Sequence, residues 1–335
     1  MELSVTPRRL LSLTLILASF LIASASRAAL PEPPAGSSDE TLVSGLAGFE
    51  NGVAAVNGIK LHYVIGGHGP LLVLLPGWPQ NWWEYHKVMP DLAKNYRVVS
   101  VDLRGMGTSD KPEAGYDKKT MAKDIAELIR HLGAKDAHVV GHDIGAQVAF
   151  AVAQNHPEVT RRLVMIDVVH PDEGFSKLAL LPEIGQFRDK VGDASHQYLW
   201  WFAFHQVKGV PERLMAGGGI RVEQDWFFHY LTVDERSIDA RSRDVYARAY
   251  WTADAIRAGN AWYQAFPQDI VDARSHGILR MPVLGIAGPG YDYLKLRLTA
   301  QATDLQMVKV ENAGHFIPEE QPAVLIENLT KFLRP

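Results

Sequence analysis

The chain has 335 residues, of which 47% are hydrophobic, and its formal net charge at pH 7 is −4. This length and composition are typical of a globular protein with a sizeable core. The absence of a basic block argues against nucleic acid as a partner. The absence of cysteine excludes disulfide bonds and thiolate metal sites. We expect the protein to need neither a metal ion nor a cofactor.

The N-terminus has the layout of a secretory signal peptide. Arg8 and Arg9 form a short basic region, residues 10–23 form an apolar stretch too short to span a bilayer comfortably, and small residues follow. We therefore predict a signal peptide over residues 1–28 and export to the periplasm or the medium, without stable membrane association after cleavage. An uncleaved membrane anchor is the alternative. Residues 29–48, rich in Pro, Gly and Ser, are predicted to be a flexible linker.

From residue 58 onward, short apolar runs alternate with helical patterns. The first run alternates apolar and polar residues, which is typical of a half-exposed antiparallel strand, and later runs are continuously apolar, as in buried parallel strands. The predicted strands are residues 58–65, 71–75, 96–101, 137–140, 162–167, 282–287 and 307–310. The helical spacing of apolar residues over 119–132 predicts an amphipathic helix. This alternation indicates an α/β protein with a mostly parallel, doubly wound sheet.

Residues 170–281 interrupt the alternation of strands and helices. This stretch is rich in aromatic residues and has a helical pattern. We predict an inserted helical cap over 170–281, between two parts of one core, 49–169 and 282–335. Most of the aromatic side chains are expected simply to pack the interior of the cap.

The most informative stretch is Gly-His-Asp-Ile-Gly at residues 141–145. It lies between a predicted strand and the predicted helix 146–153, and small residues at such a junction are typical of a nucleophile elbow. The central residue is Asp143, where esterases carry Ser. A carboxylate is a poor nucleophile toward esters but attacks an electrophilic sp3 carbon, such as that of an epoxide or an alkyl halide. The alternative is an Asp that caps the helix in a surface turn.

Three further motifs accompany the elbow in a fixed order along the chain. They are residues 75–79 (Leu-Pro-Gly-Trp-Pro), 102–109 (Asp-Leu-Arg-Gly-Met-Gly-Thr-Ser) and 313–318 (Ala-Gly-His-Phe-Ile-Pro). From about residue 50 to the end, the chain resembles the α/β-hydrolase family, and within it the epoxide hydrolases and dehalogenases whose nucleophile is Asp. The resemblance implies an α/β-hydrolase fold with a cap.

The resemblance also implies roles for individual residues. Asp143 would be the nucleophile and His315 the general base that activates a water for ester hydrolysis. The backbone N–H groups of Trp78 and Ile144 would form the oxyanion hole. The family usually has His where this chain has Pro76, a departure that bears on the subfamily more than on the mechanism. The Trp78–Pro79 peptide bond is expected to be cis by resemblance.

The acid that supports His315 has two candidates. Asp167 ends a predicted core strand. The resemblance supports this candidate, because fluoroacetate dehalogenases and some secreted bacterial epoxide hydrolases use a carboxylate at this place. Asp292 lies in the loop where most epoxide hydrolases carry their acid, although the spacing to Asp292 is one residue longer than in those enzymes. Both candidates stay open at this point.

The cap is expected to supply the group that assists the leaving oxygen. Residues 246–266 resemble the cap segment that carries a ring-opening Tyr, and the matching residue is Tyr263. The best match for the second donor position is Trp201, which can donate a hydrogen bond but cannot protonate an alkoxide. Trp262 is expected to wall the pocket. Ile144 and Gln147 depart from dehalogenases, which carry Trp or Arg after the nucleophile.

The function expected from these residues is hydrolysis of an epoxide to a vicinal diol through a covalent Asp alkyl ester. A haloalkane or haloacid dehalogenase with the same triad is the first alternative, and another carbon–heteroatom hydrolase is the second. A non-catalytic ligand-binding module on this fold is an alternative of a different class. The aromatic cap favours a small apolar or aromatic substrate. Homo-oligomerisation is left open.

Overall fold

The apolar runs of the chain meet in one sheet of eight strands. The computed structural model describes residues 31–182, 184–185, 189–190 and 198–334. The strands are β1 (Phe49–Val56), β2 (Ile59–Gly66), β3 (Leu71–Leu75), β4 (Arg97–Val101), β5 (Ala137–His142), β6 (Thr160–Ile166), β7 (Val283–Ala287) and β8 (Leu305–Lys309). Their order is β1-β2-β4-β3-β5-β6-β7-β8. The pairs β1–β2 and β2–β4 are antiparallel, and every other neighbouring pair is parallel. The predicted fold class is confirmed.

The sheet is buried where the sequence is most apolar. All five residues of β3 and all six of β5 are buried, as expected for central parallel strands covered on both faces. Strand β1 was not predicted, because its sequence, Phe-Glu-Asn-Gly-Val-Ala-Ala-Val, shows no clear alternation. It is an edge strand held by antiparallel pairing with β2 alone.

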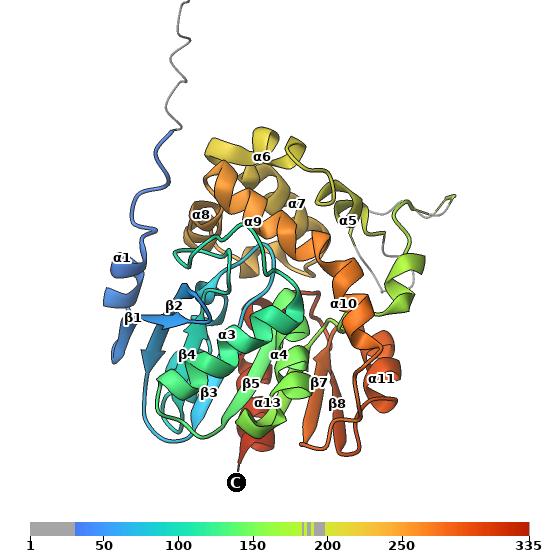
Figure 1. The fold of residues 1–335 in the computed structure, drawn as a ribbon. Helices are drawn as coiled ribbons and strands as arrows, with labels where there is room; N and C mark the ends of the chain where they lie inside the picture. Colours follow the sequence, from blue (N-terminus) through green and yellow to red (C-terminus); the bar gives the residue numbers. More distant parts are fainter. Residues whose placement is uncertain (1–30, 183, 186–188, 191–197, 335) are drawn as a thin grey trace, which may run out of the picture. The chain divides into compact units, whose positions relative to one another are not determined.

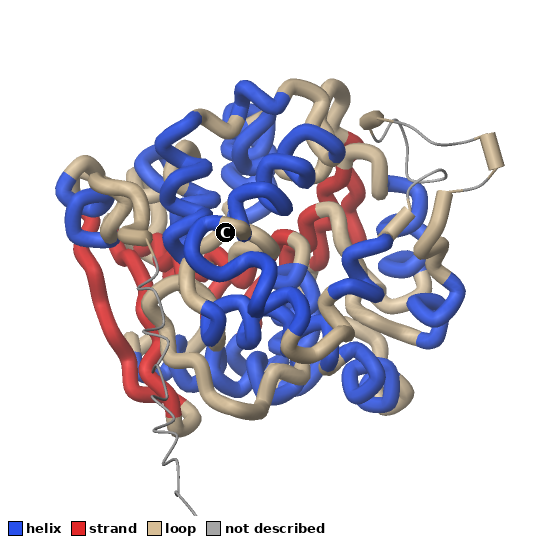
Figure 2. The backbone as a smooth tube through the Cα atoms, turned by 90° about the horizontal axis from the view of Figure 1, so that it is seen from above, coloured by secondary structure: helices blue, strands red, loops and turns tan. Residues whose placement is uncertain are grey.

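Helices cover both faces of the sheet. Figure 1 shows α3 and α4 in front of the sheet and α13 behind it, and Figure 2 shows helices on both sides of the middle of the sheet, with the strands of one edge at the outside. The helices of the core are α1 (Asp39–Ser44), α2 (Met89–Leu92), α3 (Lys118–His131), α4 (Ile144–Asn155), α11 (Tyr291–Thr299), α12 (Ile317–Glu320) and α13 (Pro322–Leu333). The predicted amphipathic helix over 119–132 corresponds to α3, whose apolar stripe is buried.

The segment between β6 and β7 contains helices and loops, and its described residues add no strand to the sheet. Its α-helices are α5 (Trp200–Phe204), α6 (Val210–Met215), α7 (Ile220–Tyr230), α8 (Ala240–Ala249), α9 (Ala253–Gln264) and α10 (Phe266–Ala273). We call this segment the insertion. Figure 1 shows helices α5 to α9 above one end of the sheet. The insertion therefore faces the loops that follow β3, β5 and β6, where the chemistry-bearing residues lie.

The N-terminal predictions fall partly outside the described residues. The predicted signal peptide, residues 1–28, lies wholly outside them. The predicted flexible linker, 29–48, is wrong for its second half, because Ser38 caps helix α1 and Leu42 is fully buried against the core. The side chains of Leu42 and Val43 are buried in the core, and this burial orders the segment despite the prolines that precede it. No helix in the described part of the chain is long and apolar enough to cross a membrane.

Candidate functional site

A sharp turn between β5 and α4 presents the side chain of Asp143. Its backbone has φ +50° and ψ −121°, a conformation that costs a non-glycine residue on the order of 1–3 kcal/mol. Gly145 lies so close to β3 that a Cβ there would meet the backbone oxygen of Leu75 at 2.0 Å. Only glycine permits this approach, so the small residues of the predicted elbow are explained by the packing of α4 against β3.

The loop after β3 holds the Asp143 carboxylate from one side. The backbone N–H of Trp78 donates to Asp143 Oδ1 at 2.8 Å. A Cβ on Gly77 would lie 2.4 Å from the Cβ of Asp143, so this position also requires glycine. The Trp78–Pro79 peptide bond is cis, as predicted. Ile144 is the first residue of α4 and lines the same pocket.

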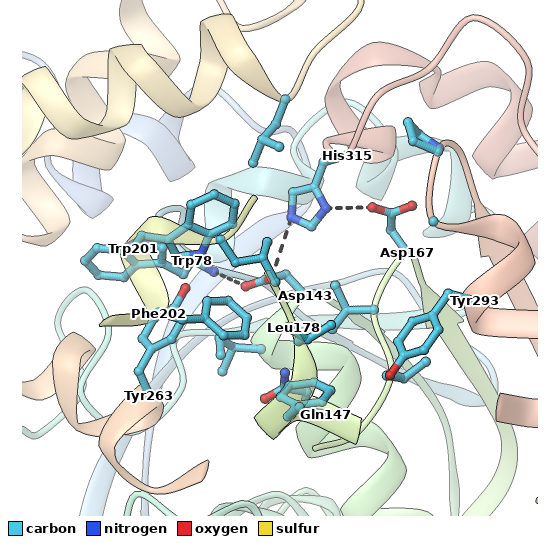
Figure 3. Close-up of a pocket in the computed structure, with 18 of the residues that line it drawn as sticks. Trp78, Asp143, Gln147, Asp167, Leu178, Trp201, Phe202, Tyr263, Tyr293 and His315 are labelled. Carbon is cyan, nitrogen blue, oxygen red and sulfur yellow. Dashed lines mark hydrogen bonds and ion pairs between the residues drawn. The ribbon is translucent and has the colours of Figure 1, made fainter. Parts of the chain in front are cut away.

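His315 approaches the carboxylate from the other side, as Figure 3 shows. Its Nε2 lies 3.7 Å from Asp143 Oδ2, and its Nδ1 lies 2.7 Å from Asp167 Oδ2. Asp167 directly follows β6 with φ +62° and accepts a hydrogen bond from Gly288 N at 3.2 Å. The backbone N–H of His315 donates to the carbonyl of Leu231 in the insertion at 2.8 Å. The imidazole is therefore held between two carboxylates.

Asp292 stands in a different relation to the imidazole. It lies in the first turn of α11, is exposed, and lines the outer part of the same pocket. Among the described residues, the carboxylates that pair with the His315 ring are Asp143 and Asp167. Of the two acids that the sequence left open, the geometry favours Asp167.

These residues line one cavity of about 660 Å³ between the sheet and the insertion. The other lining side chains are mostly apolar, and they include Val169, Phe175, Leu178, Leu199, Phe202, Phe227, Leu231, Phe266 and Leu296. This is the size and character of a site for a small organic molecule, with a few polar groups in an apolar wall.

Tyr263 on α9 and Trp201 on α5 face Asp143 across the cavity (Figure 3). Tyr263 is only 2% exposed. Burial raises the pKa of its phenol well above the ordinary value, the negative charge of Asp143 raises it further, and a hydrogen bond with Trp201 acts in the opposite direction. Tyr263 is therefore protonated at neutral pH and offers its O–H as a donor.

Trp262 does not have the predicted place in the pocket wall. It is fully buried, and its indole N–H donates to the backbone oxygen of Arg104 at 2.9 Å. Consecutive residues of a helix point about 100° apart, so a helix that directs Tyr263 into the cavity turns Trp262 into the core. The aromatic ring stacked on Tyr263 is instead that of His205, at 4.6 Å between centroids.

A buried acid–base pair lies beneath the site, and the sequence analysis missed it. His142 Nδ1 lies 3.2 Å from Glu84 Oε1, and both side chains are fully buried. His142 Nε2 contacts the backbone oxygen of His315 at 2.9 Å, and Gly77 N donates to Glu84 Oε2 at 2.8 Å. The pair thus connects the loop after β3, the elbow and the His315 loop. Glu84 stands among Trp82, Trp83 and Tyr85 in the sequence. An acid within such an apolar stretch was the signal that could have indicated a buried pair.

One further group of the described residues has the composition of a metal site. Asp39, His62 and Asp102 offer ligand atoms within 4.8 Å of one another. Their atoms already have partners, since His62 lies 2.9 Å from Asp102 Oδ2 and 2.9 Å from Asn51 Oδ1, and Asp39 Oδ1 accepts from Trp82 Nε1 at 2.8 Å. The group is well explained as a hydrogen-bonded network that fastens α1 to the core. None of its members lines the pocket.

The chain has clear similarity to known proteins. The profile of the family described as alpha/beta hydrolase fold matches residues 70–322. The soluble epoxide hydrolase of Corynebacterium sp. (strain C12) is 31% identical over 287 residues, which cover 84% of this chain and 96% of that protein. The fluoroacetate dehalogenase of Burkholderia sp is 30% identical over 223 residues, 65% of this chain and 69% of that protein.

A solved structure is similar to this chain in both sequence and fold. The crystal structure of Cfl2 from Burkholderia cenocepacia is 34% identical and matches with a TM-score of 0.75, over 86% of this chain and 96% of that chain. A match of this extent shows that the two chains share the same fold.

The buried pair predicts a pH dependence of stability. Burial disfavours charge on His142, but Glu84, with smaller effects of Asp143 and Asp167, outweighs it and raises the pKa of His142 to about 9. Because the folded pKa lies above the unfolded value of about 6.5, the stabilisation is complete below about pH 6.5 and is lost as the pH rises through about 9. In urea unfolding, the wild-type protein should lose more free energy of unfolding across this window than Glu84→Gln. Equal losses would contradict the pairing, and exposed Glu158→Gln should behave as the wild type.

Proposed function

We propose that this chain, which belongs to the α/β-hydrolase family, hydrolyses epoxides to vicinal diols through an ester formed on Asp143. The chain is a hydrolase by its family and its relatives, which removes the non-catalytic binding module from consideration. The observation that carries the proposal is the set of groups around one pocket. A carboxylate at the turn, His315 at 3.7 Å from it, and the buried Tyr263 hydroxyl all face the same cavity.

In the first step the Asp143 carboxylate attacks a ring carbon of the epoxide. Oδ1 is held by the N–H of Trp78, so Oδ2 is the oxygen free to attack. The new C–O ester bond forms as the C–O bond of the strained ring breaks. The ring oxygen takes a proton from Tyr263, which leaves a hydroxyalkyl ester on Asp143.

In the second step water hydrolyses that ester. His315 Nε2 takes a proton from the water, and Asp167 stabilises the imidazolium that forms. The hydroxide adds to the ester carbonyl, whose oxygen is the one already bound by the Trp78 N–H, with Ile144 N–H as the second donor. Collapse of the adduct releases the diol and restores the Asp143 carboxylate. The proton held by His315 then returns through solvent to Tyr263.

Tyr263 is the residue that favours epoxides over alkyl halides. A halide leaves as a stable anion and needs only hydrogen-bond donors, whereas an epoxide oxygen needs a proton. A phenol that stays protonated and faces the nucleophile fits the second requirement. Dehalogenation is the second candidate, supported by the Trp201 indole in the pocket wall and by the similarity to fluoroacetate dehalogenase. The apolar lining supports a small apolar or aromatic substrate in either case.

The two half-reactions should separate in His315→Gln. Attack by Asp143 does not need the imidazole, whereas ester hydrolysis does. Mass spectrometry after exposure to an epoxide that the wild type hydrolyses should find the epoxide mass added to the peptide that contains Asp143. A folded variant that forms no adduct would remove His315 from the second step.

The supporting acid should be identified by a matched pair of substitutions. Asp167→Asn removes the charge 2.7 Å from the His315 Nδ1 and should lower kcat by on the order of 10⁴. Asp292→Asn, in the exposed wall, should change kcat little. Diol formation measured for both folded variants tests this order, and the reverse order would transfer the role to Asp292.

The donor to the ring oxygen can be tested by removing one hydroxyl group. Tyr263→Phe removes one hydroxyl and should slow formation of the alkyl-enzyme by roughly 10²–10³, with little effect on hydrolysis of the ester once formed. Rapid mixing with tryptophan fluorescence as the readout separates the two rates. Alkylation at the wild-type rate would take this role from Tyr263.

A substrate panel tests the choice of reaction directly. The wild-type protein should form diols from epoxides and release no halide from haloalkanes or haloacids at comparable rates. Halide release without diol formation would make dehalogenation the function, and Trp201→Phe would then be the variant to examine.

A further inference from the structure

The pocket contains a polar side chain that the proposed hydrolysis does not use. Gln147 lies on α4 one helical turn after Asp143, lines the cavity and is only 2% exposed. Its Oε1 is buried without a hydrogen-bond partner in the described structure. Figure 3 shows the amide on the side of the pocket opposite His315. A buried amide oxygen without a partner is rare in native proteins and demands a cause.

The other unpartnered atom of the wall has a local explanation. Trp78 Nε1 is also buried without a partner, but its indole packs edge-on against aromatic rings, that of Tyr250 at 4.6 Å and that of His205 at 5.0 Å. Such rings are weak acceptors for an N–H group. Gln147 remains as the group whose partner is to be found in the cavity.

The charges of the wall restrict what that partner can be. Three of the residues that line the cavity, Asp143, Asp167 and Asp292, are acids, and none of the described lining residues is Lys or Arg. In an apolar, partly enclosed site a negatively charged ligand group would be repelled by these carboxylates. The partner of the amide oxygen is therefore a hydrogen-bond donor without negative charge, and a hydroxyl group is the simplest one.

We propose that Gln147 is a binding subsite for epoxides that carry a hydroxyl group a few bonds from the ring. This inference rests on the proposed function. The unpartnered Oε1 accepts, and a hydroxyl group supplies the donor that an ether or carbonyl oxygen lacks. Residues one helical turn apart have Cβ atoms roughly 5–6 Å from each other. With the ring carbon at Asp143, the second oxygen lies roughly three to five bonds away.

A subsite at Gln147 changes which of two otherwise matched substrates the pocket binds more tightly. An apolar wall favours the substrate in which CH3 replaces the hydroxyl group, because more apolar surface is buried. A site built to bond the oxygen reverses this preference, since the hydrocarbon leaves the amide unpartnered. Which of the two compounds binds more tightly therefore shows whether Gln147 bonds the ligand.

The test compares two product diols that differ in this one position. One is the diol of 1-phenyl-3,4-epoxybutan-1-ol, and the other has CH3 in place of the benzylic hydroxyl group. Their dissociation constants can be measured by quenching of the fluorescence of Trp78 and Trp201, which line the cavity, so no turnover is needed. The wild type should bind the hydroxyl compound about tenfold more tightly. Gln147→Leu, of similar volume but without an amide, should prefer the hydrocarbon.

The control is Gln154→Leu, the same substitution two turns further along α4 and outside the cavity, where the side chain bonds Gly277. It should keep the wild-type preference. A wild type that binds the hydrocarbon as well or better, or that binds neither diol, would overturn the subsite. An unchanged preference in Gln147→Leu would also overturn it, because that is the result expected if the amide only holds a water. Turnover of the two epoxides is followed separately. Absence of diol formation with the binding preference intact would overturn the proposed function and leave the subsite standing.

Discussion

The close approach of three backbone segments around Asp143 is the constraint on which the site depends. Gly145 brings α4 against β3, and Gly77 lies against the Cβ of the carboxylate itself. Side chains at these positions would push the loop after β3 away from the elbow. The backbone N–H of Trp78 would then lose Asp143 Oδ1, and the proposed oxyanion donor would be lost with it. The strained φ of Asp143 is tolerated because β5 and α4 hold both of its ends.

Charge in the site is arranged in two layers. In the upper layer, which faces the cavity, His315 lies between the carboxylates of Asp143 and Asp167. In the lower layer, wholly buried, His142 is paired with Glu84 and touches the backbone of His315. The lower layer orders the loops without exposing a competing nucleophile or base to the substrate. The apolar wall and the insertion strengthen these interactions, because the effective dielectric of such a site is lower than that of water.

Much of this arrangement could be predicted from the sequence because it is local. The apolar runs indicated seven of the eight strands, and the small residues around Asp143 indicated the turn. Three features needed the folded chain. The edge strand β1 depends on its pairing with β2. The direction of Trp262 depends on which face of α9 meets the core. The choice between Asp167 and Asp292 depends on how the loops after β6 and β7 meet His315, and those distances lie in no single stretch of sequence.

The central claim is that Asp143 forms a covalent ester with the substrate, and a single turnover in 18O-labelled water tests it most directly. Excess enzyme is mixed with an epoxide, and the diol of the first turnover is examined by mass spectrometry. One oxygen of the diol then comes from the ring and the other from the unlabelled Asp143 carboxylate, which takes up the label in exchange. The account predicts a first-turnover diol without 18O and label on the peptide that contains Asp143. A first-turnover diol that already carries one 18O would mean direct attack by water and would contradict it.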